Sequence, residues 1–178
     1  LVLFPALSVV PFIWDGVSDI VLELSHNGAT TDVMSKYQGT AKQQSLTSMN
    51  TNSTYLNGGT YFEAGTYKGI LGNSDRTIDA WIRTGAVNGE ICSWGIDRAG
   101  EKWVFRTNDN GALRVEVNGG NIIGSTLVND NKWHHVACVF SGTDVDDIKL
   151  YVDGVLETIA SSANRSIDTK TGINLRVS

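Results

Sequence analysis

Two adjacent histidines, His134 and His135, stand in the apolar run WHHVACVF. Histidine is the side chain that most often ligates metals or moves protons near neutral pH. The run is rich in β-branched and aromatic residues, which predicts a strand. Adjacent residues of a strand point to opposite faces of a sheet, so the two imidazoles cannot bind one metal ion together. The third histidine, His26, is distant in the sequence and lies beside a turn.

We therefore expect the two histidines to belong to the scaffold, one held by a hydrogen bond inside the fold and the other nearer a sheet edge. His135 shares a face of the strand with Trp133 and Val139. Because that face is apolar, we expect removal of the His135 side chain to affect stability more than removal of His134.

The two cysteines, Cys92 and Cys138, lie in the apolar runs GEICSWGI and HHVACVF. Neither their number nor their spacing indicates a disulfide framework or a zinc site. Inside a strand, a free cysteine behaves as a small buried hydrophobic side chain. We expect both thiols to be part of the core.

The elements that must position these side chains are short strands. Asn-Gly and Asp-Gly pairs tolerate the positive φ angles of tight hairpin turns. They occur at Asp15-Gly16, Asn27-Gly28, Asn57-Gly58, Asn88-Gly89, Asn110-Gly111, Asn118-Gly119 and Asp153-Gly154. Between them lie short apolar runs, whereas residues 31–48 read as a polar connection with one helical turn at most. Short strands separated by turns predict one all-β domain built as a β-sandwich.

Composition limits the function classes. The chain has 178 residues, enough for one domain with a core of its own. It carries 14 basic and 19 acidic side chains, a net charge of −5, and no basic run stands out. Nucleic acids and anionic membrane surfaces are bound by clustered lysine and arginine, so neither is an expected partner.

The first residues of the chain, LVLFPALSVVPFIW, are continuously apolar. No basic residue precedes them, as one would in a signal peptide. They are too short for a membrane span, and Pro5 and Pro11 would break a helix. We expect a strand here, or two short strands divided by proline. The missing initiator Met leads us to expect a chain that is processed or excised from a longer one.

The stretch from residue 131 to residue 157 carries a family resemblance. Its Trp-His-His-Val-Ala strand, polar hairpin and Lys-Leu-Tyr-Val-Asp-Gly turn resemble the signature of laminin-G-like jelly rolls in the concanavalin A-like lectin and glucanase superfamily. Upstream, GTYFEA and RTIDAWIRT resemble the family's paired strands, and VVPFIWDGVSD and SHNG resemble its first strand and loop. The resemblance covers residues 9–178, weakly over 31–52. It implies a jelly-roll β-sandwich of two antiparallel sheets, with residues 1–8 as an N-terminal apolar arm or extra strand.

One departure concerns the end of the chain. Family members usually continue past the equivalent of GINLRVS with a Gly-rich loop and a final strand that pairs near the first. This sequence ends at Ser178, before the place of that strand. An unpaired edge beside an apolar segment favours association. Either the sequence is a fragment, or residues 1–8 complete the sheet, within the chain or from a neighbouring copy, so self-association is one expected interaction.

Glucanases of this superfamily use carboxylates placed on one strand in a Glu-x-Asp-x-x-Glu-like pattern. Nothing in this sequence has that spacing. Glu116 lies between two valines on an ordinary strand, and Glu90 and Glu101 lie near turns. A Gly-x-Ser-x-Gly elbow and a phosphate-binding Gly loop are also missing. We expect the chain not to be an enzyme.

No motif requires a cofactor, and calcium is the one ion for which candidate ligands stand out. Some relatives in the family bind calcium through loop Asp and Asn side chains and backbone carbonyls, because hard cations need several converging oxygens. The alternative is that the loop GTDVDD is a solvated hairpin whose charges keep the chain soluble. The candidate ligands are Asp97, Asp144, Asp146 and Asp147, with Asp15 and Asp19 beside the first turn.

An exposed tryptophan ring suits a sugar, which has an apolar C–H face and a rim of hydroxyls. Such a ring could lie at the loop GIDRAGEK, which two tryptophans flank. Trp103 alternates with Phe105, which favours the core, whereas Trp94 stays open between core and surface. The resemblance places Trp81 and Trp133 in the core. The candidate ligand-binding residues are Trp94, Arg98, Trp103, Arg106 and Asn108.

These predictions favour a noncatalytic recognition module, carbohydrate-binding or adhesive, for a glycan or another surface ligand of an extracellular or surface protein. The alternative is a structural subunit of a virion, surface layer or filament that uses the jelly roll as an assembly unit. The fold alone does not choose between them.

Overall fold

The structure is a computed structural model of the chain. It describes the backbone of residues 2–10, 22–25, 33–34, 41–44, 48–50, 53–56 and 61–178. Side chains are described for Leu56, Tyr61 and residues 63–178. Outside the described residues lie Trp14, Asp15, Asp19, His26 and the turns at 15–16, 27–28 and 57–58.

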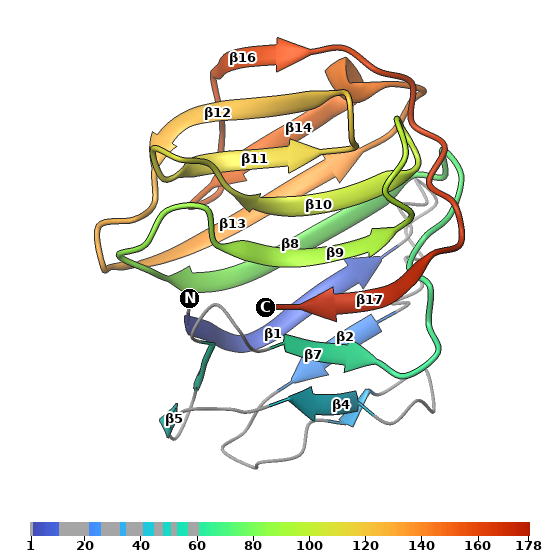
Figure 1. Cartoon of the computed structure of the whole chain (residues 1–178). Coiled ribbons are helices and arrows are strands. Elements are labelled where there is room, and N and C mark those ends of the chain that lie inside the picture. Colours follow the sequence, from blue (N-terminus) through green and yellow to red (C-terminus); the bar gives the residue numbers. More distant parts are fainter. Residues whose placement is uncertain are drawn as a thin grey trace.

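The described strands form two antiparallel sheets that face each other (Figure 1). Sheet A has the order β15-β14-β13-β8-β1-β2-β3, with β6 beside β1 and β5 beside β6; sheet B has the order β16-β12-β11-β10-β9-β17-β7-β4. The strands of sheet A are β1 (Val2–Val10), β2 (Leu22–Ser25), β3 (Val33–Met34), β5 (Ser48–Asn50), β6 (Ser53–Tyr55), β8 (Arg76–Arg83), β13 (Trp133–Phe140), β14 (Ile148–Val152) and β15 (Val155–Leu156). Those of sheet B are β4 (Ala41–Gln44), β7 (Tyr61–Ala64), β9 (Glu90–Gly95), β10 (Lys102–Thr107), β11 (Ala112–Glu116), β12 (Asn121–Leu127), β16 (Ile159–Ala163) and β17 (Ile173–Val177). The predicted jelly-roll β-sandwich is confirmed.

The only described helix is one turn of 3₁₀ helix, η1 (Val145–Asp147), between β13 and β14. In the part of the chain that the structure describes, no helix is long and apolar enough to cross a membrane. Residues 31–48, predicted as a polar connection, contain β3 and β4 instead. The polar composition of this segment gave no strand pattern, although β3 and β4 are short edge strands of the two sheets.

Alternation along the strands builds the core between the sheets. On β8, Ile78, Ala80 and Ile82 are fully buried, while the residues between them face outward. On β13, Val136 and Phe140 are buried on the same inner side of sheet A. Because side chains of a strand alternate between faces, each sheet presents one apolar face to the core and one outer face. The two outer faces are where a ligand can bind.

The two ends of the described chain are both strands inside a sheet. β1 pairs with β8 on one side and with β2 and β6 on the other. Its register against β8 shifts between Phe4 and Leu7, around Pro5, which lacks the N–H that a ladder needs. β17 lies between β9 and β7. In the described part of the chain, β1 therefore has a neighbouring strand on each side.

Among the described turn pairs, two have positive φ at both residues, whereas Asn88-Gly89 and Asn110-Gly111 have it at one residue each. Asn118 and Gly119 both have positive φ between β11 and β12, as do Asp153 and Gly154 between β14 and β15. A two-residue hairpin loop with positive φ at both positions matches the twist of the strands that it joins. The Asn-Gly and Asp-Gly pairs therefore fix the registers of these hairpins.

Candidate functional site

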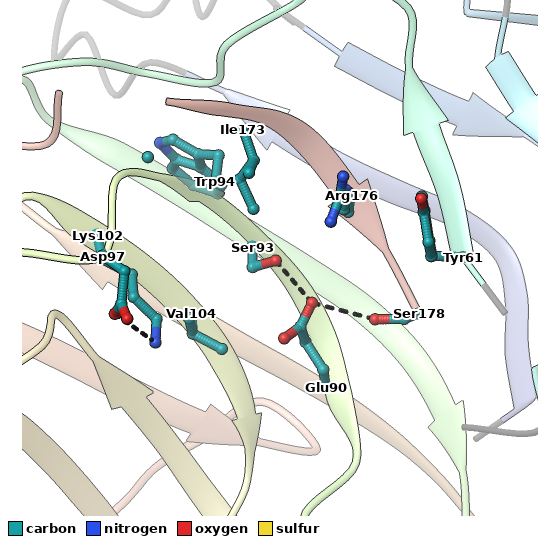
Figure 2. Close-up of a pocket in the computed structure, with 11 residues that line it drawn as sticks. Tyr61, Glu90, Ser93, Trp94, Asp97, Lys102, Val104, Ile173, Arg176 and Ser178 are labelled. Atoms are coloured by element: carbon teal, nitrogen blue, oxygen red, sulfur yellow. Dashed lines mark hydrogen bonds and ion pairs between the residues drawn. The ribbon is translucent and has the colours of Figure 1, made fainter. Parts of the chain in front are cut away.

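The outer face of sheet B is hollowed where β7, β17, β9 and β10 lie side by side (Figure 2). The hollow has a volume of about 320 Å³. Its floor is set by register, because Arg176 pairs with Ser93 and Ser93 pairs with Val104 across the sheet. Ser93 and Val104 are buried although they face outward. The longer side chains around them form the wall: Tyr61, Glu90, Lys102, Ile173 and Arg176, with Asp97 and Ser178.

Glu90 organises the polar side of the hollow. Its Oε1 accepts hydrogen bonds from the hydroxyls of Ser93, at 2.6 Å, and Ser178, at 3.1 Å. A bulge between β9 and β10, where Phe105 pairs with Cys92 but Arg106 pairs with Glu90, brings this carboxylate to the outer face. The site therefore contains a fixed acceptor.

Arg176 supplies donors on the opposite side. Its guanidinium lies over the ring of Tyr61, 4.5 Å from the ring centroid, and its Nη2 is 3.7 Å from Oε1 of Glu63. Among the residues that the structure describes, its buried Nε has no hydrogen-bond partner. Arg176 thus brings a guanidinium to the wall of the hollow, held by Tyr61 and Glu63.

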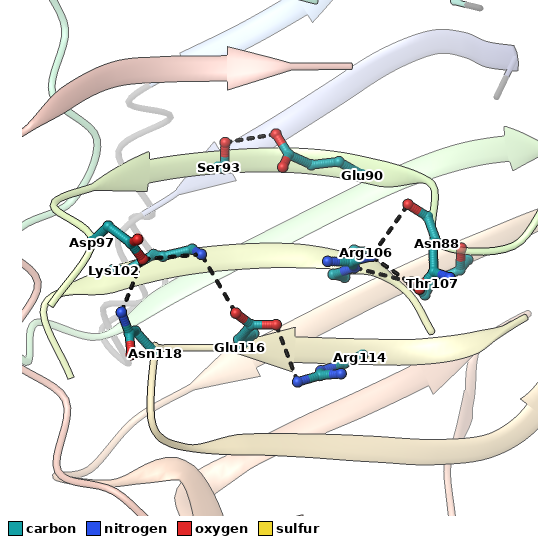
Figure 3. Close-up of polar contacts among 10 residues, drawn as sticks. All are labelled: Asn88, Glu90, Ser93, Asp97, Lys102, Arg106, Thr107, Arg114, Glu116 and Asn118. Carbon is teal, nitrogen blue, oxygen red and sulfur yellow. Dashed lines mark hydrogen bonds and ion pairs between the residues drawn. The ribbon is translucent and has the colours of Figure 1, made fainter. Parts of the chain in front are cut away.

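Charges of both signs alternate along the rest of this face (Figure 3). Lys102 lies 3.4 Å from both Asp97 and Glu116, and Arg114 lies 3.1 Å from Glu116. Asn118 donates to Asp97 at 2.9 Å. Donors and acceptors are therefore interleaved on partly exposed side chains, without a block of either sign.

The structure corrects the predicted role of the two tryptophans at this sheet. Trp94 and Trp103 are both fully buried, with their rings stacked 5.8 Å apart. The indole N–H of Trp94 donates to the carbonyl of Ile70, and the backbone of Gly69 packs against its ring. Trp94 borders the hollow of sheet B, but both rings are fully buried and present no open face to a sugar. The alternation that assigned Trp103 to the core was right, and Trp94 belongs there too.

Buried Arg76 packs against these rings. Its guanidinium lies 4.9 Å from the ring centroid of Trp103 and donates to the carbonyls of Ile70, Gly72 and Ser74 and to the hydroxyl of Thr169. Burial lowers the pKa of Arg76 to about 10. Carbonyl dipoles and aromatic faces thus stabilise a cation inside the sandwich.

The three polar residues predicted to assist the tryptophans do not converge. Arg98 is exposed in the loop between β9 and β10. Arg106 lies near the other end of β10 and bonds the backbone and side chain of Asn88. Asn108 is buried, and its Oδ1 accepts from the amides of Asn110 and Ala112, which fixes the turn before β11. The structure therefore does not bring these three side chains together, and their part in ligand binding stays a prediction.

The predicted calcium ligands are not brought together either. Oδ1 of Asp144 accepts from the amide of Asp146, and Oδ2 of Asp147 accepts from the amides of Thr143 and Asp144, so the loop caps η1. These amide hydrogen bonds lower the pKa of Asp147. Asp97 lies at the hollow of sheet B. Among the described residues, no three Asp, Glu, His or Cys side chains are grouped to hold a metal ion.

The two histidines do lie on opposite faces with separate partners, but their expected burial is reversed. Nδ1 of His134 is 2.8 Å from Asp153 and its Nε2 is 3.1 Å from Asp130, and only 14% of its side chain is exposed. Nε2 of His135 is 3.1 Å from Asp79, and 32% of its side chain is exposed. Partial burial acts to lower the pKa of His134, but hydrogen bonds and charges from the two aspartates outweigh it and raise the pKa. His134 therefore faces the core side of sheet A, and His135 the outer side.

Two further expectations concern the core. Cys92 and Cys138 are free and fully buried, as predicted, and burial raises the pKa of both thiols. Trp81, expected in the core, is instead 43% exposed. It lies between buried Ala80 and Ile82 on β8, so its ring must face outward. The described tryptophan with the most exposed ring is thus on sheet A rather than at the loop after β9.

The comparisons with known proteins agree with this fold. Residues 56–177, more than half of the chain, match the family model of the concanavalin A-like lectin/glucanases superfamily. The chain belongs to this family, which indicates a binding or adhesive module. No curated protein matches the sequence. A similar solved structure is that of domains LG4-5 of the mouse laminin alpha1 chain, at 17% identity and a TM-score of 0.46, covering 76% of this chain and 38% of that one. The chain thus spans less than half of the length of that structure.

Proposed function

We propose that the chain is a noncatalytic recognition module of an extracellular or surface protein. It binds a neutral, hydroxyl-rich glycan in the hollow on the outer face of sheet B. The observation that carries the proposal is the placement of a fixed acceptor, Glu90, and a guanidinium donor, Arg176, around one hollow.

The interleaved charges favour hydroxyls over ions as ligand groups. A hydroxyl both donates and accepts, so it can bond a carboxylate and a guanidinium at once. A polyanion would meet Glu90, Glu116 and Asp97 on this face, and a polycation would meet Arg176, Lys102 and Arg114. Only a neutral ligand leaves these ion pairs intact.

The bonding of the carboxylates supports a binding role over a catalytic one. Glycoside hydrolysis needs one carboxyl group that donates a proton and a second that acts as base or nucleophile. Here Glu63 is bonded to Asn174, Glu90 to two hydroxyls, and Glu116 to Lys102 and Arg114. Each is held as an acceptor by its neighbours.

The test is an array of neutral oligosaccharides, probed with the purified chain and two variants. Glu90→Gln is nearly isosteric with the wild type, and Arg176→Gln shortens the side chain. We expect saturable binding that weakens by about tenfold or more in each variant, because each loses a hydrogen bond to a charged group. The control is Arg98→Gln, which alters an exposed arginine outside the hollow. Equal binding by all four proteins, or no binding to any neutral glycan, contradicts the proposal. Because the proposed contacts are hydrogen bonds alone, we expect binding to be unchanged in excess EDTA.

A second candidate function, an assembly unit, rests on one edge of the sandwich. β16 is an edge strand of sheet B whose five residues are all exposed, and it carries no charge or proline. Leu127, Val155 and Leu156 are exposed beside it. Uncharged edge strands pair readily with other chains. Sedimentation equilibrium of wild type and Ser161→Lys tests this function: association with rising concentration that the lysine abolishes supports it, and a wild-type monomer at all concentrations removes it.

A further inference from the structure

The outer face of sheet A carries an aromatic residue that the chain covers only in part. Trp81 is on β8, in the interior of the sheet, where it pairs in register with Phe4 of β1 and His135 of β13. Even so, its side chain is 43% exposed. An indole in the middle of a sheet face, rather than at an edge, presents a flat apolar surface to the surroundings.

A polar pair flanks this indole. The ring of His135 lies 5.4 Å from the ring of Trp81, tilted by 49°. Nε2 of His135 is 3.1 Å from Oδ2 of Asp79, which is two residues before Trp81 on the same strand and so on the same face. The three side chains, which we call the Trp81 platform, combine an apolar plate with an imidazole and a carboxylate at its side.

We propose that the Trp81 platform is a second carbohydrate site that binds the apolar face of a neutral pyranose. The ring C–H groups stack on the indole, and the hydroxyls at the edge of the sugar bond Asp79 and His135. Indole faces and sugar C–H faces are matched in shape and polarity, and a hydroxyl can donate to the carboxylate.

The polar pair decides between ligand classes. An apolar protein surface covering Trp81 would also desolvate Asp79 and His135, which is unfavourable unless new hydrogen bonds replace water. A nucleotide could stack on the indole, but its phosphates would lie near Asp79, and the chain has a net charge of −5. A neutral sugar satisfies both the plate and the pair.

The platform lies on the side of the sandwich opposite the hollow of sheet B, because the core separates the two outer faces. Two sites that face in opposite directions cannot be occupied by one short oligosaccharide. A single copy of the chain therefore bridges two glycans, which gives a recognition module an adhesive property. The platform does not depend on the function proposed for sheet B, since none of its residues lines that hollow.

The test uses an array of neutral oligosaccharides and the variants Trp81→Ala and Asp79→Asn. We expect both variants to weaken binding to one set of glycans by about tenfold or more. Trp81→Ala removes the stacked aromatic ring, and Asp79→Asn removes a hydrogen bond to a charged group. Leu156→Ala, which removes another exposed apolar side chain from the outer edge of sheet A, is the control and should bind as wild type does. Thermal unfolding of each variant shows that the fold persists, and Asp79→Asn remains informative if Trp81→Ala unfolds.

The same glycans should protect wild-type fluorescence from acrylamide, since Trp81 is exposed whereas Trp94 and Trp103 are buried. Binding to this set should survive Arg176→Gln, which separates the platform from the hollow of sheet B. Wild-type binding by both Trp81→Ala and Asp79→Asn, with no protection from acrylamide, overturns the platform. Glycan binding lost only in Arg176→Gln and Glu90→Gln also overturns it and leaves the hollow as the site.

Discussion

His134, near the start of β13, forms hydrogen bonds or ion pairs with two acidic residues. It contacts Asp153, in the turn after β14, and Asp130, in the loop before β13. Asp130 is also paired with Lys132, 2.8 Å away, and these contacts lower its pKa. The pKa of Asp153 is lowered as well, because hydrogen bonds from His134 and from the amide of His135 outweigh the opposing effect of burial. The two carboxylates therefore favour the charged form of the imidazole, and only the folded chain brings them to it.

This geometry predicts how stability depends on pH. Because the pKa of His134 is raised on folding, its contribution is complete below the unfolded value, about 6.5, and is lost as pH rises through the folded pKa. Over roughly pH 5 to 9, where His134 titrates, Asp130 and Asp153 stay ionised because their pKa values are lowered. We expect His134→Gln to lower the unfolding free energy by about 1 kcal/mol at acid pH and by less at pH 9.

Thermal and urea unfolding across this range, with His135→Gln as the matched control, checks the prediction. A deficit in His134→Gln that stays constant or grows as pH rises would show that the charged imidazole does not stabilise the fold. The same data compare the two neighbours directly. The opposite faces of these histidines could be predicted from strand alternation, but which face was buried could not, because Trp133 and Val139 look as apolar as Val136 and Phe140.

At the scale of elements, the connection between β7 and β8 packs against the core. Gly69 lies in this connection with a φ of 74°, and its backbone contacts the ring of Trp94. A Cβ at residue 69 would overlap the indole, whereas no heavy atom lies within 4 Å of a Cβ built at Gly72, which has a φ of 66°. The two glycines thus share a backbone conformation and differ in their surroundings.

Gly69→Ala and Gly72→Ala form a matched pair. Each substitution costs about 1 kcal/mol because φ is positive, and Gly69→Ala adds about 1–3 kcal/mol of overpacking. Denaturant unfolding should therefore rank Gly69→Ala as clearly less stable than Gly72→Ala. Equal stability of the two variants would mean that this loop does not press on Trp94.

Strand elements could be predicted well because turn pairs and alternation are local signals. Side-chain direction at irregular positions could not. In β9 the bulge opposite Phe105 and Arg106 breaks strict alternation, so Ile91 and Cys92 are both buried and Trp94 also faces inward. Trp81 was misplaced for another reason: the family resemblance suggested a core position, although alternation places Ile78, Ala80 and Ile82 on the apolar face and Trp81 on the other. The candidate site depended on such positions, and for this reason most of its residues were missed.

At the scale of the molecule, the sandwich separates two different outer faces. Sheet B presents interleaved donors and acceptors around a hollow, and sheet A presents Trp81 beside an ionisable pair. Arg176 of β17 meets Glu90 and Ser93 of β9 at the hollow although these two strands are far apart in sequence, and only the strand order brings them together. No local sequence motif marks such a site, so the sequence predicts the fold but not this surface.

The central claim is that the hollow of sheet B binds a neutral glycan. Its most direct test is amide chemical-shift mapping of the isotope-labelled chain, titrated with the neutral oligosaccharide that loses array binding in both Glu90→Gln and Arg176→Gln. We expect saturable shifts concentrated at Ser93, Val104, Arg176 and their neighbours on β7, β17, β9 and β10, unchanged by EDTA. Saturable shifts that leave these four strands unaffected would contradict it.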